Sequence, residues 1–308
     1  ASIGIVKFPD QAATAEELLC NLALATARAK QLGRNRHEVF SPGCAAAAPD
    51  RMRLEADLHR ALDRDELRLY YQPKVCARTG KIRGSEALLR WEHSERGLVS
   101  PGEFIPLAEE TGLIVPFGSW VIGTACEQLA RWHRLGWTDL GVAVNVASLQ
   151  LKEGNLLAVV RQALEASGVN AAMLTLELTE SAVIENAAET IETLRALREL
   201  GVKLSLDDFG TGYSSLSYLD RLPITELKID RSFVSKIDKH GDNAPILSAV
   251  IAMGRHLGLQ VVAEGVENEA QRDFLALHAC DVYQGFWFAR PLPAADFADW
   301  VAAKSHLS

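Results

Sequence analysis

The sequence predicts an α/β barrel, and two observations indicate it. From about residue 140 onward, short apolar runs typical of buried parallel strands alternate with helical stretches. Six of these runs end on side chains that can bind a metal ion or a phosphate: Asn145, Glu177, Asp207–Asp208, Lys228, Glu264 and Gln284. Charged side chains are rarely buried without a partner. Because barrel enzymes carry their catalytic groups at the carboxyl ends of the strands, the pattern predicts both the fold and the position of the active site.

The first part of the chain is predicted to lie outside the barrel. Residues 1–41 have the pattern of a strand, a helix over 15–32 and a second strand over 37–40. A unit of this size is too small to bury a core of its own, so we expect a small α/β appendage that is the remainder of another domain. Residues 42–51 are rich in alanine and bounded by prolines, and we interpret them as a linker. The barrel domain is then expected to occupy residues 52–308.

The barrel domain begins in an unusual way. A helix over 52–63 is followed by strands over 67–71 and 82–89, separated by a turn at Thr79–Gly80. This hairpin-like start predicts a modified TIM (β/α)8 barrel, in which the first strand runs against the others. Further helices are predicted over 101–111, 120–135, 154–167, 187–200, 214–221, 243–257, 268–278 and 294–304.

Composition narrows the class of protein. The 308 residues include 32 basic and 40 acidic side chains, a net charge of −8, which disfavours binding to duplex nucleic acid and suits a site for divalent cations. Five cysteines without a Cys-x-x-Cys pair indicate reduced thiols in the cytoplasm and no zinc site. No apolar stretch approaches the roughly 18 residues that span a bilayer, so no membrane segment is expected in this chain, although a longer parent protein could be anchored upstream.

A series of motifs along the chain carries a family resemblance. Glu86-Ala87-Leu88, followed by Leu89-Arg90-Trp91, resembles the signature of EAL domains, the cyclic di-GMP phosphodiesterases. The resemblance covers about residues 52–304 and includes, in family order, Tyr71-Gln72-Pro73, the block 101–109, Glu177-Leu178-Thr179-Glu180, the block 207–216, Lys228-Ile229-Asp230 and Glu264-Gly265-Val266-Glu267. Residues 2–40 resemble the end of a GGDEF (diguanylate cyclase) domain without its signature loop. This chain is therefore not expected to make cyclic di-GMP, and upstream GGDEF or sensor domains are expected in the parent protein.

The resemblance implies a function and assigns roles to residues. It implies hydrolysis of cyclic di-GMP to linear 5′-pGpG by a homodimer that holds two metal ions. The implied metal ligands are Glu86, Asn145, Glu177, Asp207, Asp208 and Glu267. The implied catalytic residues are Lys228, Glu264, Gln284 and Glu177. The implied substrate contacts are Gln72, Glu86, Leu88, Arg90 and Asp208, and Glu180 is expected to support the loop that follows Asp208.

The residue types indicate the same chemistry. The candidate ligands offer only oxygen atoms, which favour Mg²⁺ or Mn²⁺ over Zn²⁺. Asp207 and Asp208 are adjacent, and a turn of the backbone at a strand end would let them serve two ions about 4 Å apart, an arrangement used to hydrolyse phosphodiesters. Ca²⁺ is expected to bind and inhibit, because it prefers more ligands at longer distances.

Other interpretations stay open at this point. Glu180 and Glu267 could cap helices or loops, Lys228 could be a surface lysine, and Asp230 is expected to cap the next helix. The histidines follow no ligand spacing, and the tryptophans are expected to be packing residues. For the whole domain, the alternatives are a catalytically inactive EAL module that acts as a cyclic di-GMP receptor, and an unrelated metal-dependent barrel enzyme.

Overall fold

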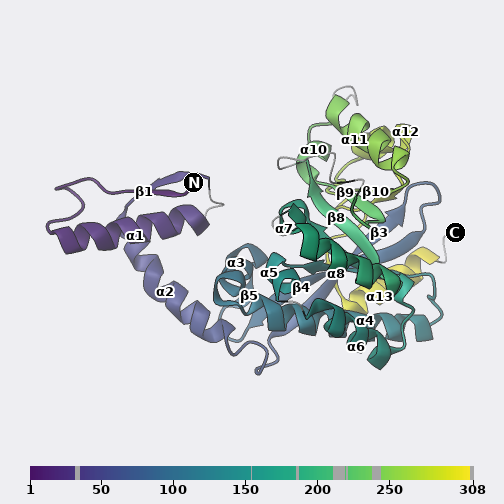
Figure 1. Ribbon diagram of the computed structural model, residues 1–308, viewed down its shortest axis with the longest axis horizontal. Helices are drawn as coiled ribbons and strands as arrows, with labels where there is room; N and C mark the ends of the chain where they lie inside the picture. The colour runs from purple at the N-terminus through teal and green to yellow at the C-terminus, as the bar shows by residue number, and fades with distance from the viewer. Residues whose placement is uncertain are drawn as a thin grey trace. The chain divides into compact units, whose positions relative to one another are not determined.

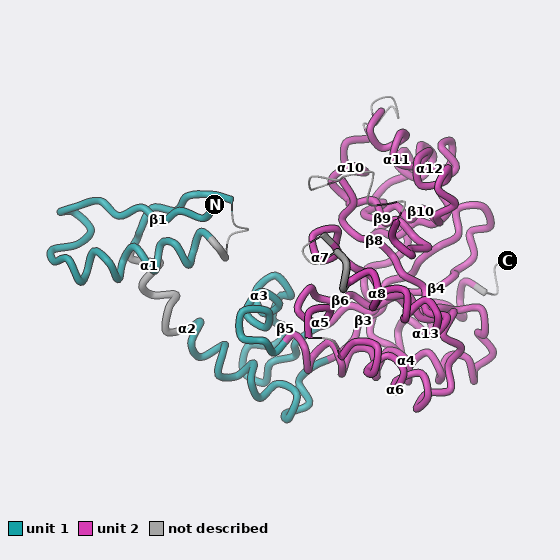
Figure 2. The backbone as a smooth tube through the Cα atoms, viewed as in Figure 1, with its two compact units in different colours: residues 1–67, 90–113 teal, residues 68–89, 114–308 magenta. Residues whose placement is uncertain are grey.

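The computed structural model describes residues 1–31, 35–153, 155–184, 187–210, 219, 221–237 and 244–305. The chain divides into two compact units, one of residues 1–67 and 90–113 and the other of residues 68–89 and 114–308 (Figure 2).

The larger unit is built on a barrel whose eight strands close on themselves. Around the barrel the strands follow the order β3, β11, β10, β9, β8, β7, β6, β4, and β4 pairs again with β3. Neighbours from β4 to β11 are parallel, and β3 is antiparallel to β11, which confirms the expected antiparallel first strand. The bounds are β3 Leu67–Cys76, β4 Ile82–His93, β6 Gly141–Val146, β7 Leu174–Thr179, β8 Lys203–Phe209, β9 Glu226–Ile229, β10 Gln260–Ala263 and β11 Val282–Tyr283, with β5 Gly97–Val99 and β12 Leu292–Pro293 pairing at the edges of β4 and β3.

Helices surround the strands, and α4 and α6 lie side by side on one side of the barrel (Figure 1). The long ones are α4 Ile114–Arg134, α6 Leu156–Ser167, α8 Ala187–Glu199, α11 Pro245–His256, α12 Glu269–Leu277 and α13 Ala294–Ser305. The short ones are α5 Ser148–Lys152, η1 Ala171–Met173, α7 Glu180–Ile184 and α10 Arg231–Val234. Each long helix matches a predicted one within a few residues, except that α4 begins six positions before the predicted residue 120. The predicted helix over 214–221 falls almost wholly outside the described residues.

Alternation along the strands separates an apolar outer layer from a polar interior. In β7, Leu174, Leu176 and Leu178 are fully buried in the core shared with the helices, whereas Glu177 between them contacts groups inside the barrel. Successive side chains of a strand point to opposite faces, so this pattern follows from the sequence. TIM barrels usually fill the interior with branched apolar side chains. Here charged residues occupy it.

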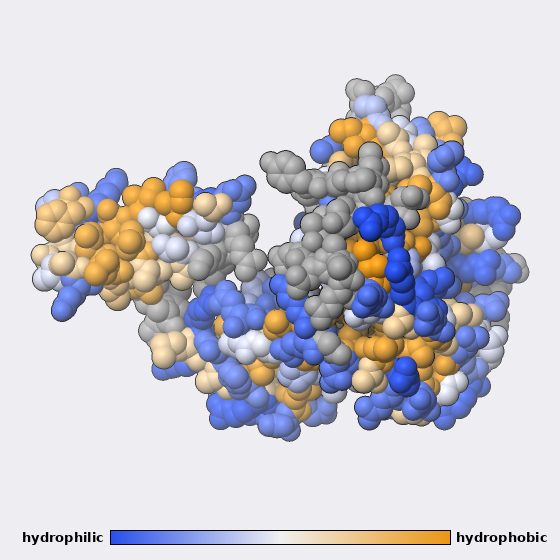
Figure 3. All heavy atoms as spheres, viewed as in Figure 1, coloured by the Kyte–Doolittle hydropathy of each residue, from blue (hydrophilic) through white to orange (hydrophobic). Residues whose placement is uncertain are grey.

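The smaller unit contains the appendage and the helices that follow it. Strands β1 Ile3–Ile5 and β2 His37–Val39 form a parallel pair, and α1 Ala15–Gln31 packs so closely on β1 that a Cβ at Gly4 would clash with the Leu22 carbonyl oxygen. The view in Figure 3 shows apolar surface on this part of the chain, where Ile3, Phe8, Leu19 and Leu22 are exposed.

The predicted linker is helical. Helix α2 runs over Pro42–Leu58, so it begins where the linker was expected and ends before the predicted residue 63. Proline at the first helical position and a run of alanines, the strongest helix formers, favour this outcome. Helix α3, Pro101–Thr111, ends at Gly112 with a φ of 77° as expected, but the Ser100 side chain makes no capping hydrogen bond.

Among the described helices, none is by itself both long and apolar enough to cross a membrane. Helices α3 and α4 pass such a test only when they are counted together as one broken segment.

Candidate active site

A buried lysine stands at the centre of the site. Lys228, in β9, is fully buried, and its ammonium contacts carboxylates from several strands. The Nζ atom lies 2.6 Å from Glu177 Oε2 in β7, 3.0 Å from Asp207 Oδ2 in β8, 2.5 Å from Glu264 Oε1 after β10 and 3.6 Å from Glu86 Oε2 in β4. These positions lie toward the carboxyl ends of parallel strands, where the sequence pattern placed them. The surface-lysine interpretation of Lys228 is thereby excluded.

A second buried lysine was not anticipated from the sequence. Lys74 Nζ, in β3, donates to Glu177 Oε1 at 2.6 Å and to Glu226 Oε1 at 3.0 Å. Glu177 therefore accepts hydrogen bonds from two ammonium groups, one on each oxygen. The signal that could have found Lys74 is the length of β3, which continues through the lysine to Cys76 instead of ending near Tyr71. A lysine inside a buried strand requires a carboxylate partner.

The two lysines determine the protonation of Glu177. Burial by itself raises the pKa of Glu177, but the ammonium groups of Lys228 and Lys74 outweigh burial and hold that pKa at about 2. Burial by itself lowers the pKa of Lys228, but the surrounding carboxylates, Glu177 first, raise it well above the usual value. At neutral pH, Glu177 is therefore ionised and Lys228 is protonated.

The other carboxylates bind protons more tightly. Burial raises the pKa of Glu264 to about 8, although Lys228 opposes the rise. Burial also raises the pKa of Glu86, with repulsion from Glu177 adding to it, and the pKa of Asp207. Five described carboxylates face two ammonium groups in the barrel, an excess of three acids over bases: Glu86, Glu177, Asp207, Glu226 and Glu264 against Lys74 and Lys228. Added cations would relieve this excess.

Amide side chains hold Glu86 in place. Gln284 Nε2 donates to Glu86 Oε2 at 2.5 Å and to Gln72 Oε1 at 3.0 Å, and Asn145 Nδ2 donates to Glu86 Oε1 at 2.7 Å. Gln72 in turn donates to the Ala289 carbonyl oxygen at 3.2 Å. The structure thus brings Gln72, Glu86, Asn145 and Gln284 together. The strand-end pattern had predicted Asn145 and Gln284, and the family resemblance implied Gln72 and Glu86.

The Asp207–Asp208 pair has the turned backbone that the sequence argument required. Asp208 has a φ of 55°, in the left-handed region, and its backbone N–H donates to Asp207 Oδ1 at 2.9 Å. The register between β8 and β9 shifts at this point. Burial raises the pKa of Asp208, and repulsion from Asp230 adds to it. Non-glycine residues in this conformation are uncommon, and they cluster at functional sites.

Glu180 lies beside the start of the loop that it was expected to support. It is the first residue of α7, and its Oε2 accepts a hydrogen bond from the Gly210 backbone N–H at 3.5 Å. Residues 211–218, the rest of that loop, lie outside the described residues. Asp230 caps α10 by accepting from the Ser232 backbone N–H at 2.9 Å, which confirms its predicted structural role.

Three predicted site residues are not placed in the cluster by contacts that the structure describes. Glu267 is exposed after β10, and its backbone N–H donates to Gln271 Oε1 at 2.7 Å. Leu88 and Arg90 follow Glu86 along β4 and are half-buried. Arg90 belongs to the smaller compact unit.

The donor set suits a hard divalent cation, because it consists of carboxylate and amide oxygens. Gln284 Oε1 is buried and has no hydrogen-bond partner among the described residues, so this oxygen is available to accept from a donor or to bind a cation. Within the same residues, no three His, Cys, Asp or Glu side chains are arranged as a ready metal-binding group, since the carboxylates contact Lys228 instead. The chemistry of the site therefore fits a metal ion, and its carboxylates already converge on a cation.

Comparison with known proteins agrees with this geometry. Residues 55–291 match the EAL domain family. The chain is 47% identical over 302 residues to the bifunctional diguanylate cyclase/cyclic di-GMP phosphodiesterase MucR of Pseudomonas aeruginosa and 44% identical over 303 residues to the cyclic di-GMP phosphodiesterase NbdA of the same organism. These alignments cover 98% of this chain but only 44% and 39% of the two relatives.

Solved structures of EAL domains are also similar to this chain. The structure of the PaMucR phosphodiesterase in complex with c-di-GMP is 49% identical, with a TM-score of 0.76 over 80% of this chain and 99% of that chain. The cAMP-bound EAL enzyme Bd1971 is 30% identical, with a TM-score of 0.77 over 95% of this chain and 76% of that chain.

Proposed function

This chain belongs to the EAL-domain family, and from that premise we propose that it is a metal-dependent phosphodiesterase that hydrolyses cyclic di-GMP to linear 5′-pGpG. The observation that carries the proposal is the convergence of Glu86, Glu177, Asp207 and Glu264 on the buried ammonium of Lys228. A receptor that only held the dinucleotide would have no need for so many buried carboxylates, which are costly to bury.

The proposed cofactor is a pair of Mg²⁺ or Mn²⁺ ions. Ions held by Glu86, Asn145, Glu177, Asp207, Asp208 and Glu267 would neutralise the scissile phosphate and activate the attacking water. The all-oxygen composition of this set supports the assignment.

The chain's own residues position and charge the site. Lys228 holds Glu177 and Asp207 in fixed orientations and provides a positive charge where negative charge develops on the attacked phosphate. Glu264, with a pKa of about 8, can release and take up a proton near neutral pH, which suits a group beside the attacking water. Gln284 keeps Glu86 from rotating.

Substrate contacts and assembly belong to the same proposal. Arg90 would hold a phosphate of the substrate, and Gln72, Leu88 and Asp208 would contact the rest of the dinucleotide. A homodimer linked to the loop after Gly210 is proposed, with Glu180 holding the start of that loop. A cytoplasmic location is also proposed, and the described cysteines, all free thiols, support it.

Turnover of the purified protein tests the proposal. Cyclic di-GMP is incubated with the protein in Mg²⁺, Mn²⁺ or Ca²⁺, and the nucleotides are separated by reversed-phase chromatography. Linear pGpG is expected in Mg²⁺ and Mn²⁺, while Ca²⁺ is expected to permit binding and to suppress turnover. Binding of cyclic di-GMP without product in either Mg²⁺ or Mn²⁺ would contradict the proposal and favour the receptor function.

A further inference from the structure

Glu226, Lys74 and Glu177 are connected in series by two hydrogen bonds. Glu226 Oε1 accepts from Lys74 Nζ at 3.0 Å, and the same ammonium donates to Glu177 Oε1 at 2.6 Å. All three side chains are almost completely buried, with side-chain exposures of 8%, 8% and 0% for Glu226, Lys74 and Glu177. None of the roles proposed above uses Lys74 or Glu226.

The Glu226–Lys74 pair lies toward the amino-terminal ends of the barrel strands. Glu226 is the first residue of β9, whereas Lys228, toward the carboxyl end of the same strand, binds the other oxygen of Glu177. The Glu177 carboxylate is thus held between two ammonium groups, one on each of its oxygens. Bidentate restraint of this kind fixes the rotation of a carboxylate about its terminal torsion, which is otherwise broad.

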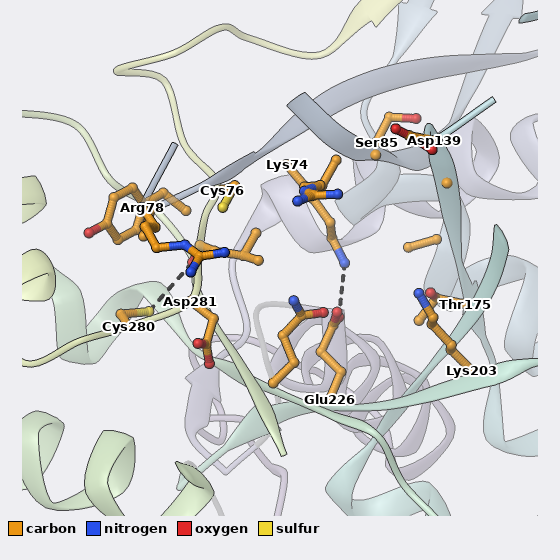
Figure 4. Close-up of a pocket in the computed structure, with 18 of the residues that line it drawn as sticks. Lys74, Cys76, Arg78, Ser85, Asp139, Thr175, Lys203, Glu226, Cys280 and Asp281 are labelled. Atoms are coloured by element: carbon orange, nitrogen blue, oxygen red, sulfur yellow. Dashed lines mark hydrogen bonds and ion pairs between the residues drawn. The ribbon is translucent and has the colours of Figure 1, made fainter. Parts of the chain in front are cut away.

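A cavity lies behind Lys74. It has a volume of about 920 Å³ and is lined by residues near the starts of the strands, among them Gly141, Thr175, Lys203 and Gln260. Figure 4 shows Lys74 pointing across the middle of this cavity onto Glu226. On the cavity side, the described hydrogen bond of the Lys74 ammonium is the one to Glu226, so Glu226 restrains this ammonium together with Glu177.

We propose that Lys74 and Glu226 are positioning residues, which hold Glu177 in the orientation that metal binding requires. This inference rests on the proposed function. Residues that orient a metal ligand through hydrogen bonds typically change metal affinity about 10- to 100-fold when they are replaced. Lys74 acts through Glu177 and does not itself touch the reacting atoms.

The affinity for metal, measured without substrate, tests the proposal, because a positioning role and a purely electrostatic role predict changes in opposite directions. Replacing Lys74 with Met removes a positive charge beside Glu177, so a purely electrostatic role predicts tighter binding of Mn²⁺. A positioning role predicts the opposite, because Glu177 loses its fixed orientation. We expect Lys74→Met to raise the dissociation constant for Mn²⁺ about 10-fold or more, measured by electron paramagnetic resonance of free Mn²⁺.

Two further variants complete the design. Glu226→Gln keeps the shape of the partner and leaves Lys74 in place, so we expect it to disturb the fold less than Lys74→Met does. We expect a smaller loss of Mn²⁺ affinity, of about threefold. Lys203→Met removes an exposed lysine that lines the same cavity and is expected to leave the affinity unchanged. Unchanged or tighter Mn²⁺ binding in both Lys74→Met and Glu226→Gln overturns the positioning role.

The readout also separates this inference from the proposed function. If the wild-type protein binds Mn²⁺ but produces no pGpG, the phosphodiesterase proposal fails while the affinities still decide the role of Lys74. If the wild type is active, Lys74→Met is expected to lower kcat at saturating Mn²⁺ more than it raises the KM for cyclic di-GMP.

Discussion

Replacing Lys228 with Met in the metal-free protein should show how much the Lys228 ammonium contributes to the free energy of unfolding. Lys228 is fully buried and lies within 3.0 Å of three carboxylates, Glu177, Asp207 and Glu264. Removing one partner of a buried ion pair typically costs about 3–5 kcal/mol, because the remaining charge has lost its compensation. We therefore expect Lys228→Met to lower the free energy of unfolding by about this amount at pH 8.

The loss should depend on pH in a definite direction. Without Lys228, burial raises the pKa values of the neighbouring carboxyls in the folded state above their unfolded values. A group of this kind stabilises the fold fully below its unfolded pKa, and the contribution is lost as pH rises through the folded pKa. The difference between variant and wild type should therefore be smaller at about pH 5.5, where the carboxyls take up protons, than at pH 8.

Urea unfolding followed by circular dichroism in EDTA measures both quantities. Lys203→Met, at an exposed position of β8, serves as the control and should change stability by no more than about 0.5 kcal/mol. A loss below about 1 kcal/mol for Lys228→Met, or the same loss at both pH values, would refute the argument that this lysine compensates the buried carboxylates.

Four further predictions concern metal binding and turnover. Glu177→Gln should abolish pGpG formation while the far-UV circular dichroism stays unchanged, because the substitution removes charge without volume; near-normal turnover would contradict its role as a ligand. Lys228→Ala should lower kcat about 100-fold or more with little change in substrate affinity, whereas Arg90→Ala should mainly raise KM. If Lys228→Ala lost substrate binding as strongly as it lost rate, the lysine would be a substrate-binding residue and its catalytic role would be wrong. Because Glu264 has a pKa of about 8 in the metal-free protein, it holds a proton at pH 7. Mg²⁺ binding should therefore release protons, and the affinity for Mg²⁺ should rise as the pH approaches 8. Calorimetry that gave the same heat of binding in buffers of different ionisation enthalpy would refute this prediction. Glu180→Ala should weaken both the homodimer and the response to metal, measured by light scattering and titration, and a strictly monomeric wild type with full activity would contradict the link.

Much of the fold could be predicted because its signals are local. A buried parallel strand requires an apolar run, and a helix requires an apolar stripe, so most elements of the barrel were identified within a few residues. The stripe Ile191, Leu194 and Leu197 of α8 is buried as its spacing indicates, and Gly201, with a φ of 94°, follows the helix end. Residues 42–51, predicted as a linker, are helical, because proline is compatible with the first turn of a helix and does not have to break it.

The candidate site was predictable only in part, for a geometric reason. Residues at strand ends can be recognised in the sequence, because a charged side chain interrupts an apolar run. Lys228 and Glu177 were found in this way. Lys74 lies inside β3 between Pro73 and Val75, and its partners are 103 and 152 positions away along the chain. Such pairs follow from the closure of the barrel, which the local pattern of residues does not encode.

The hollow end of the barrel places the Lys74–Glu226 pair against a cavity that Glu177 itself does not line. The dinucleotide is expected at the carboxyl ends of the strands, while the cavity of about 920 Å³ opens at their amino-terminal ends and reaches Lys74 and Glu226. A small molecule lodged there would compete with Glu177 for the Lys74 ammonium and would never meet the substrate. Inhibition from this side would be noncompetitive, and raising the concentration of cyclic di-GMP would not overcome it. Chemical control of this domain therefore need not imitate a nucleotide.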